Sequence, residues 1–225
     1  MQISIKREDK IESFKIDKVT TLLEALFQIK EKQDHTLTFD SGCKSGVCGC
    51  CSVRVNGKEK LACSYNIQDN DLIEPLKYYQ IKKDLLVDKS KSLELLKNQR
   101  AYIDEYKKEI LDTKDEELTQ IQSDCILCSS CYSACPVIEV KGEFLGPFAL
   151  TRAFRYSVDK RDKASKEIID NIQNNGIWDC TLCNECTLVC PMGIDPKNDI
   201  VLLRNKSAQF GYIDPNFNNF TFNIF

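Results

Sequence analysis

The sequence of 225 residues is poor in histidine and in long apolar runs. It has 1 histidine, and it lacks any stretch of about 18 consecutive apolar residues, the length that a membrane-spanning helix needs. The chain opens with MQISIKREDK, which carries charges where a secretory signal has an apolar segment, so we expect no signal peptide. Because the formal charge is −3 and no basic stripe is present, we also expect no nucleic-acid partner.

Cysteine, by contrast, is abundant. The chain has 13 cysteines, and all except Cys50 fall into three sets with the spacing of metal ligands. The first set begins with C-x4-C-x2-C and ends on a later thiol; we call it the Cys43 group, and it comprises Cys43, Cys48, Cys51 and Cys63. This is the plant-type spacing of a 2Fe–2S cluster.

The other two sets come from a repeated run of the form C-x2-C-x2-C-x3-C-P. In two-cluster ferredoxins the fourth cysteine of each such run binds the other cluster. We therefore predict two crossed ligand sets for cubane-type clusters. The Cys125 group comprises Cys125, Cys128, Cys131 and Cys190, and the Cys180 group comprises Cys180, Cys183, Cys186 and Cys135. Proline after the last cysteine of each run would end the wrap around the cluster, since it lacks the N–H and fixes φ.

Other uses of these cysteines fit less well. Structural zinc also uses paired CxxC units, but it does not require the third step or the trailing C-x3-C-P. Disulfides are disfavoured by the odd cysteine count and by the absence of a secretory signal. Cys50 lies beside Cys51, and spacing favours Cys51 as the ligand. This leaves Cys50 as a small residue in a tight loop, or as an alternative ligand or redox thiol.

The predicted fold class is α+β, with two domains. Residues 1–88 are expected to form a β-grasp, plant-type ferredoxin domain with strands at 1–5, 11–16 and 72–75, a helix over 20–33 and a hairpin at Asn56-Gly57. Residues 89–225 are expected to form an all-α, bacterial-type dicluster ferredoxin domain, with helical stretches at 91–111, 147–157 and 163–172. In the first stretch we expect an apolar face of Leu95, Leu96, Tyr102, Ile103 and Tyr106.

Three segments carry a family resemblance. They are CKSGVCGCCSVRVNGKEKLAC at 43–63, YYQIKKDLLVD at 78–88 and FLGPFALTRAFRYSVDKRD at 144–162. Together with the order of the three cysteine sets, they resemble the iron–sulfur subunit of the succinate dehydrogenase and fumarate reductase family over nearly the whole chain.

The resemblance implies a complex in which an FAD-containing flavoprotein subunit interconverts succinate and fumarate. This chain would relay single electrons between the flavin and a quinone or quinone-reactive subunit, with the Cys43 group nearest the flavin and the Cys180 group at the far end. It would perform no bond-making chemistry itself. The complex would lie peripherally on the cell inner membrane, held through partner subunits and with this chain on the cytoplasmic face.

The chain departs from the usual family pattern in two places. Members usually lack the second cysteine of the last run and hold a 3Fe–4S cluster there. Because Cys183 restores that ligand, we predict one 2Fe–2S and two 4Fe–4S clusters, with one 4Fe–4S and one 3Fe–4S as the alternative if Cys183 is not a ligand. The family's usual quinone-pocket tryptophans and histidine are also absent; Trp178 serves either as a quinone wall or as core packing, and His35 is expected to lie on the surface.

Both departures resemble a less usual branch, in which the partner is a cysteine-rich subunit similar to heterodisulfide reductase and fumarate is reduced with a methylmenaquinol or with thiols. A conventional membrane anchor is the other partner considered. Two further alternatives are a freestanding ferredoxin-like carrier and a subunit of a heterodisulfide-type or glycolate/lactate oxidase complex. The Cys43 group argues against the last of these, and the size of the chain argues against a simple carrier.

Overall fold

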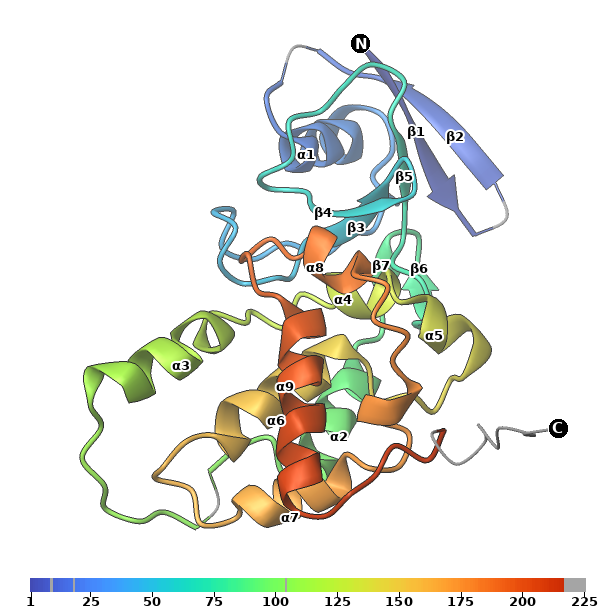
Figure 1. The fold of residues 1–225 in the computed structure, drawn as a ribbon. Coiled ribbons are helices and arrows are strands. Elements are labelled where there is room, and N and C mark those ends of the chain that lie inside the picture. Colours follow the sequence, from blue (N-terminus) through green and yellow to red (C-terminus); the bar gives the residue numbers. More distant parts are fainter. Residues whose placement is uncertain (9, 18, 104, 217–225) are drawn as a thin grey trace, which may run out of the picture.

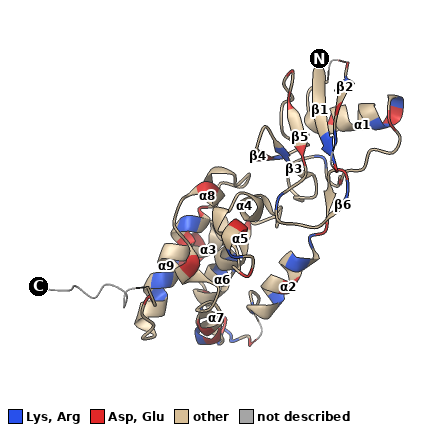
Figure 2. Ribbon diagram, turned by 90° about the vertical axis from the view of Figure 1, so that its right-hand side faces the viewer, with Lys and Arg blue, Asp and Glu red and all other residues tan. Residues whose placement is uncertain are grey.

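The computed structural model describes residues 1–8, 10–17, 19–103 and 105–216, so the end of the predicted second domain, residues 217–225, lies outside the described residues. The chain forms two stacked halves (Figure 1). We call β1 to β5 with α1 the sheet half and α2 to α9 the helical half. Residues of both charge signs lie on α7 and on α9 (Figure 2). Among the described residues, no helix has both the length and the apolar character needed to cross a bilayer.

The sheet half is built on five strands in the order β2-β1-β5-β3-β4. Their bounds are Gln2–Arg7 for β1, Lys10–Lys15 for β2, Ser52–Val55 for β3, Lys58–Leu61 for β4 and Leu72–Glu74 for β5. β1 pairs with β5 in parallel, and the other neighbours are antiparallel. The three predicted strands and the hairpin are confirmed; Asn56 and Gly57 both have positive φ, at 51° and 81°, as a tight two-residue hairpin turn requires.

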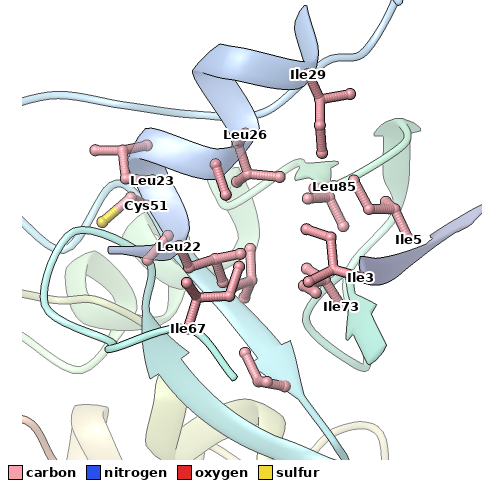
Figure 3. Packing of buried hydrophobic residues seen from close by; sticks show 14 of the residues in the cluster. Ile3, Ile5, Leu22, Leu23, Leu26, Ile29, Cys51, Ile67, Ile73 and Leu85 are labelled. Carbon is pink, nitrogen blue, oxygen red and sulfur yellow. The ribbon is translucent and has the colours of Figure 1, made fainter. Parts of the chain in front are cut away.

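Helix α1 (Leu22–Lys32) crosses this sheet and closes its core. It begins at a capping box, in which the Thr21 hydroxyl accepts from the Glu24 N–H while the Glu24 carboxylate accepts from the Thr21 N–H. Its apolar face carries Leu22, Leu26 and Ile29, which point toward Ile3, Ile5 and Ile73 of the sheet (Figure 3). Burial of each such side chain contributes about 1.5–3 kcal/mol to the free energy of folding, relative to leaving it exposed.

A short hairpin joins the two halves, formed by β6 (Ile81–Lys83) and β7 (Leu86–Val87). Its turn residue Asp84 is buried and accepts from Arg7 Nε at 2.9 Å and from the Thr38 N–H at 2.8 Å. Leu85 packs into the core of the sheet half, whereas Val87 packs into the core of the helical half. The hairpin therefore belongs to both cores, and the domain boundary at residue 88 stays a prediction.

The helical half contains eight α-helices and one 3₁₀ helix within the part of the chain that the structure describes. Their bounds are α2 Ser90–Asn98, α3 Thr113–Ser123, α4 Ser130–Ser133, α5 Pro136–Val140, α6 Pro147–Ser157, α7 Ser165–Asn171, η1 Ile177–Asp179, α8 Glu185–Leu188 and α9 Pro196–Gln209. The central helix is α6, which contacts α2, α3, α4, α7 and α9. Its bounds are those predicted, and α7 lies within the third predicted stretch, 163–172.

The prediction of a helix over 91–111 is wrong beyond Asn98. Arg100 has a left-handed φ of 51°, and the following backbone hydrogen-bonds to another loop: Lys107 N donates to Arg161 O at 2.9 Å, and Lys163 N donates to Glu105 O at 3.1 Å. Of the expected apolar face, Leu95 and Leu96 are half-buried, but Tyr102 and Tyr106 are exposed. The cross-loop pairing replaces the helical hydrogen bonds, so this segment lies along the surface.

Candidate metal centres

The loop before β3 carries Cys43, Cys48 and Cys51 and lies against Cys63, which follows β4; its backbone N–H groups point at sulfur atoms. The N–H groups of Ser45 and Val47 each lie 3.4 Å from Cys43 Sγ, and the Gly46 N–H lies 3.2 Å from Cys63 Sγ. Gly46 has a φ of 77°, a conformation that glycine adopts without strain. Such donors stabilise negative charge on sulfur, which is what a cluster ligand carries when bound.

The four thiols of this group have different environments. The N–H groups of Ser45 and Val47 lower the pKa of exposed Cys43 to about 6, because they hydrogen-bond to the thiolate. Burial raises the pKa of Cys51 to about 11, and its thiol lies beside that of Cys63. The site thus pairs one thiol that ionises readily with one that needs a bound cation to ionise.

Cys50 and Cys51 differ in which thiol they adjoin. The Cys50 thiol lies next to Cys48, and this contact together with burial raises its pKa. Cys51 is buried in the core of the sheet half and adjoins Cys63. The thiols of these two neighbouring cysteines therefore adjoin different thiols of the Cys43 group.

In the helical half, the fold brings Cys190 to the first run. Cys125, Cys128, Cys131 and Cys190 line one cavity, which is otherwise walled by apolar side chains such as Phe148 and Pro191. Within the described ranges, no three Cys, His, Asp or Glu side chains converge closely enough to ligate one common ion. The four thiols of this group instead surround a space.

The fold likewise brings Cys135 to the second run. The Cys135 thiol lies within electrostatic range of Cys180 and Cys183, and Cys186 lies within range of all three. The two groups are neighbours, because Cys131 also lies within range of Cys186. The crossed arrangement predicted from the spacing is therefore the spatial arrangement of the thiols, while their role as ligands stays a prediction.

The two runs also share a local backbone. Leu127 and Ser129 of the first run have φ values of 52° and 71°, and Leu182 and Asn184 at the matching positions of the second have 56° and 76°. A non-glycine residue with a positive φ lowers the stability of the fold. Such residues are common at functional sites, where the surrounding structure holds them in place. After the first run, Pro136 ends the loop that carries the cysteines and also occupies the first turn of α5.

Burial shapes the thiols of both groups. It raises the pKa of Cys125, Cys131, Cys135, Cys180 and Cys190, and it raises that of Cys186 to about 12. Several buried thiols that face one another cannot all ionise unless positive charge is placed among them. The donor set therefore fits iron–sulfur clusters, whose iron atoms supply that charge.

Gly49 brings the Cys43 loop against the Cys125 group. It has a φ of 70°, and a Cβ atom there would lie 2.7 Å from the Ile126 carbonyl oxygen and 2.8 Å from Cys128 Cα. Any larger residue would push the two loops apart. The three groups consequently follow in spatial order: the Cys43 group, the Cys125 group, then the Cys180 group.

Trp178 is half-buried against the core of the helical half, where its Nε1–H donates to Gln173 Oε1 at 2.9 Å. The Arg204 guanidinium lies 5.6 Å from the centre of its ring. These contacts favour the packing interpretation of Trp178, and its relation to a quinone stays untested. His35 is exposed, with Nδ1 2.8 Å from the Lys30 carbonyl oxygen.

Two basic residues near the thiols were missed by the sequence analysis. Arg204 of α9 donates to the carbonyl oxygens of Ile177 and Cys180, both at 2.7 Å. Lys89, just before α2, donates to carbonyls in two cysteine loops. No short-range pattern identifies either residue, because each acts on a loop far away in the sequence.

Comparison with known proteins agrees with this geometry. Residues 2–94 match a family described as "2Fe-2S iron-sulfur cluster binding domain", and residues 121–194 match one described as "4Fe-4S dicluster domain". A chain of the Mycobacterium smegmatis Sdh1 complex in the apo form superposes with a TM-score of 0.80 at 20% identity, covering 95% of this chain and 98% of that one. The predicted α+β fold with two ferredoxin-like parts is confirmed.

Two relatives bear on the family, and the first of them is similar enough over its length to show it. The fumarate reductase iron-sulfur subunit of Haemophilus influenzae is 35% identical over 91% of this chain and 89% of its own length. The 8-methylmenaquinol:fumarate reductase iron-sulfur subunit of Wolinella succinogenes is 36% identical over 85% of this chain, which spans 65% of that protein. The chain belongs to the family of succinate dehydrogenase and fumarate reductase iron–sulfur subunits.

Proposed function

We propose that this chain relays single electrons between an FAD-containing flavoprotein subunit, which interconverts succinate and fumarate, and a quinone-reactive subunit. The observation that carries the proposal is the row of three thiol groups, in which the Cys43 loop touches the Cys125 group through Gly49 and Cys131 adjoins Cys186. The names of the Haemophilus and Wolinella relatives support fumarate reduction as the chemistry of the complex.

In this proposal the Cys43 group holds one 2Fe–2S cluster, and the Cys125 and Cys180 groups each hold one 4Fe–4S cluster. A bound cluster supplies one-electron redox chemistry. The chain's residues would provide the thiolate ligands, backbone N–H groups that offset their charge, and the mostly apolar walls around the Cys125 group. If Cys183 is not a ligand, the Cys180 group would hold a 3Fe–4S cluster instead.

The chain itself would make and break no substrate bonds. A flavin exchanges two electrons with its substrate, while each cluster carries one, so a relay is needed to separate the two electrons in time. The proposed role of the chain is this relay, and the chemistry of succinate and fumarate belongs to the flavoprotein partner.

The partner at the far end is either a membrane anchor or a cysteine-rich quinone-reactive subunit. Cys183 and the Wolinella relative, whose name specifies a methylmenaquinol, favour the cysteine-rich partner. Through that partner the chain would sit peripherally at the inner membrane, on its cytoplasmic face.

Anaerobic purification of the tagged chain from its own cells tests the proposal. We expect an FAD-containing flavoprotein to co-purify, and we expect succinate or fumarate to change the EPR spectrum of the chain's clusters. A chain that purifies alone with intact clusters, and whose spectrum responds to neither compound, would instead be a freestanding carrier.

A further inference from the structure

Lys89 lies where the two halves meet, between two of the cysteine loops. It is half-buried at the end of the β6–β7 hairpin and directly precedes α2. Its Nζ donates to the carbonyl oxygens of Gly49 at 3.2 Å, Cys50 at 3.3 Å and Cys128 at 3.5 Å. One side chain thus bridges the loop of the Cys43 group and the loop of the Cys125 group.

The geometry of these contacts matches a charged amine. Three carbonyl oxygens accept from Nζ, and an ammonium has three N–H donors, whereas a neutral amine has two. The thiols of Cys51 and Cys128 lie within electrostatic range, and so does the Asp40 carboxylate. Burial lowers the pKa of Lys89, while negative charge on Cys128, Asp40 and Cys51 acts in the opposite direction and favours the charged amine.

We propose that Lys89 is a positioning residue that clamps the first two cluster loops together and raises the reduction potentials of both clusters. The inference rests on the proposed function, since it takes the Cys43 and Cys125 groups to hold clusters. Reduction adds negative charge, so a fixed positive charge close to both sites favours the reduced state of each. The Cys180 group has no such contact with Lys89 among the described residues, and it serves as an internal reference.

Potentiometric titration monitored by EPR tests this directly. The neutral variant Lys89→Met should lower the potentials of the 2Fe–2S cluster and of the Cys125-group cluster together. We expect about a tenfold change in the ratio of reduced to oxidised cluster at a fixed applied potential, which equals about 59 mV for a one-electron couple. The potential of the Cys180-group cluster should stay unchanged.

Lys91→Met is the matched control. Lys91 is exposed on α2, two residues after Lys89, and its Nζ donates to the Gly142 carbonyl oxygen at 3.0 Å, away from the cysteine loops. Lys91→Met removes the same charge from the chain as Lys89→Met does. An effect of net charge alone on the potentials would therefore appear in both variants. We expect all three potentials to be unchanged in Lys91→Met.

The conservative variant Lys89→Arg keeps the charge and should retain potentials close to those of the unchanged protein. If Lys89→Met does not load its clusters, Lys89→Gln against Lys89→Arg provides the same comparison. Loaded clusters with equal potentials in the charged and neutral variants would overturn the inference alone. A protein that lacks the 2Fe–2S and 4Fe–4S signals before any substitution would overturn the proposed function instead.

Discussion

The two halves of the molecule differ in the secondary structure that lies beside their thiols. In the sheet half, a capped helix packs on five strands and completes an apolar core that includes Cys51, while Cys43 is exposed on a loop outside it. In the helical half, Cys135 and Cys186 are themselves buried. The segments beside them are very short, since α4 and α8 have 4 residues each.

This difference predicts that α4 and α8 depend on bound clusters more than the strands of the sheet half do. Helices of a single turn are not stable by themselves in water, because nucleation costs more than the few hydrogen bonds return. Buried thiols with raised pKa values also give little stabilisation until a metal binds them. Both halves have a large apolar core, so we expect apolar packing to stabilise the sheet half and the longer helices of the helical half, and metal ligands to stabilise α4 and α8.

The largest expected effect follows from removal of the iron. After chelation, the amides of α4 and α8 should lose protection from hydrogen exchange, while those of β1, β3 and β5 should keep it. Exchange followed by mass spectrometry before and after chelation gives the comparison directly. Equal loss of protection in both halves would show that the sheet half depends on iron as well.

A smaller effect is expected from Gly49→Ala, which tests the contact between the halves. The added Cβ would meet Ile126 and Cys128, so we expect the free energy of unfolding to fall by about 2–4 kcal/mol. Gly57→Ala is the control, because Gly57 has a similar φ of 81° but its nearest neighbour is a flexible Arg54 side chain at 3.6 Å. That variant should lose about 1 kcal/mol in the same denaturant titration, from backbone strain alone. Equal losses would mean that the loops do not touch at Gly49.

Asp199 makes the stability of the helical half pH-dependent. It is buried on α9 and accepts from Gln122 of α3 and Thr151 of α6, both at 2.8 Å, and burial raises its pKa to about 6. The folded state then binds the proton more tightly than the unfolded state, whose Asp pKa is about 3.9, so stability falls as the pH rises between these values.

The change that Asp199 contributes between pH 5 and pH 8 is about 1 kcal/mol, with most of it lost by about pH 6.5. Denaturant titrations across this range should show the decline in the unchanged protein and a weaker pH dependence in Asp199→Asn, which cannot ionise. The same slope in both proteins would assign the effect to another group.

The smallest effect is expected for Cys50→Ser. Because the Cys50 thiol adjoins Cys48 while Cys51 adjoins Cys63, the serine variant should keep the 2Fe–2S EPR signal unchanged. Cys51→Ser is the contrasting variant and should lose or alter that signal. If the two variants behave in the opposite way, Cys50 is the ligand.

Local sequence signals predicted the elements that they encode. Asn56-Gly57 formed the expected hairpin turn, and the apolar pattern after Thr21 formed α1. The capping box of Asp112 and Asp115 at α3, and Asp195 with Pro196 at α9, are signals of the same kind that the sequence analysis did not use. The helices α3 and α9 were therefore not predicted, although these residues indicate where each helix begins.

Contacts between distant segments could not be predicted in this way. Lys89 lies 39 residues from both Cys50 and Cys128, and nothing in its own neighbourhood indicates that its amine reaches their carbonyls. Likewise, no glycine or proline marks the end of α2 near Arg100; the helix ends because the next segment pairs with residues 161–163. The repeated cysteine spacing is the exception, since its crossed arrangement follows from the known geometry of two-cluster ferredoxins.

The most direct test of three clusters held by crossed thiol groups is low-temperature EPR on the anaerobically purified protein, oxidised and after dithionite, with an iron count. The account predicts about ten iron atoms per chain, no oxidised three-iron signal in the unchanged protein, and such a signal in Cys183→Ser. An oxidised three-iron signal in the unchanged protein, or a lower iron count with intact chains, would contradict it.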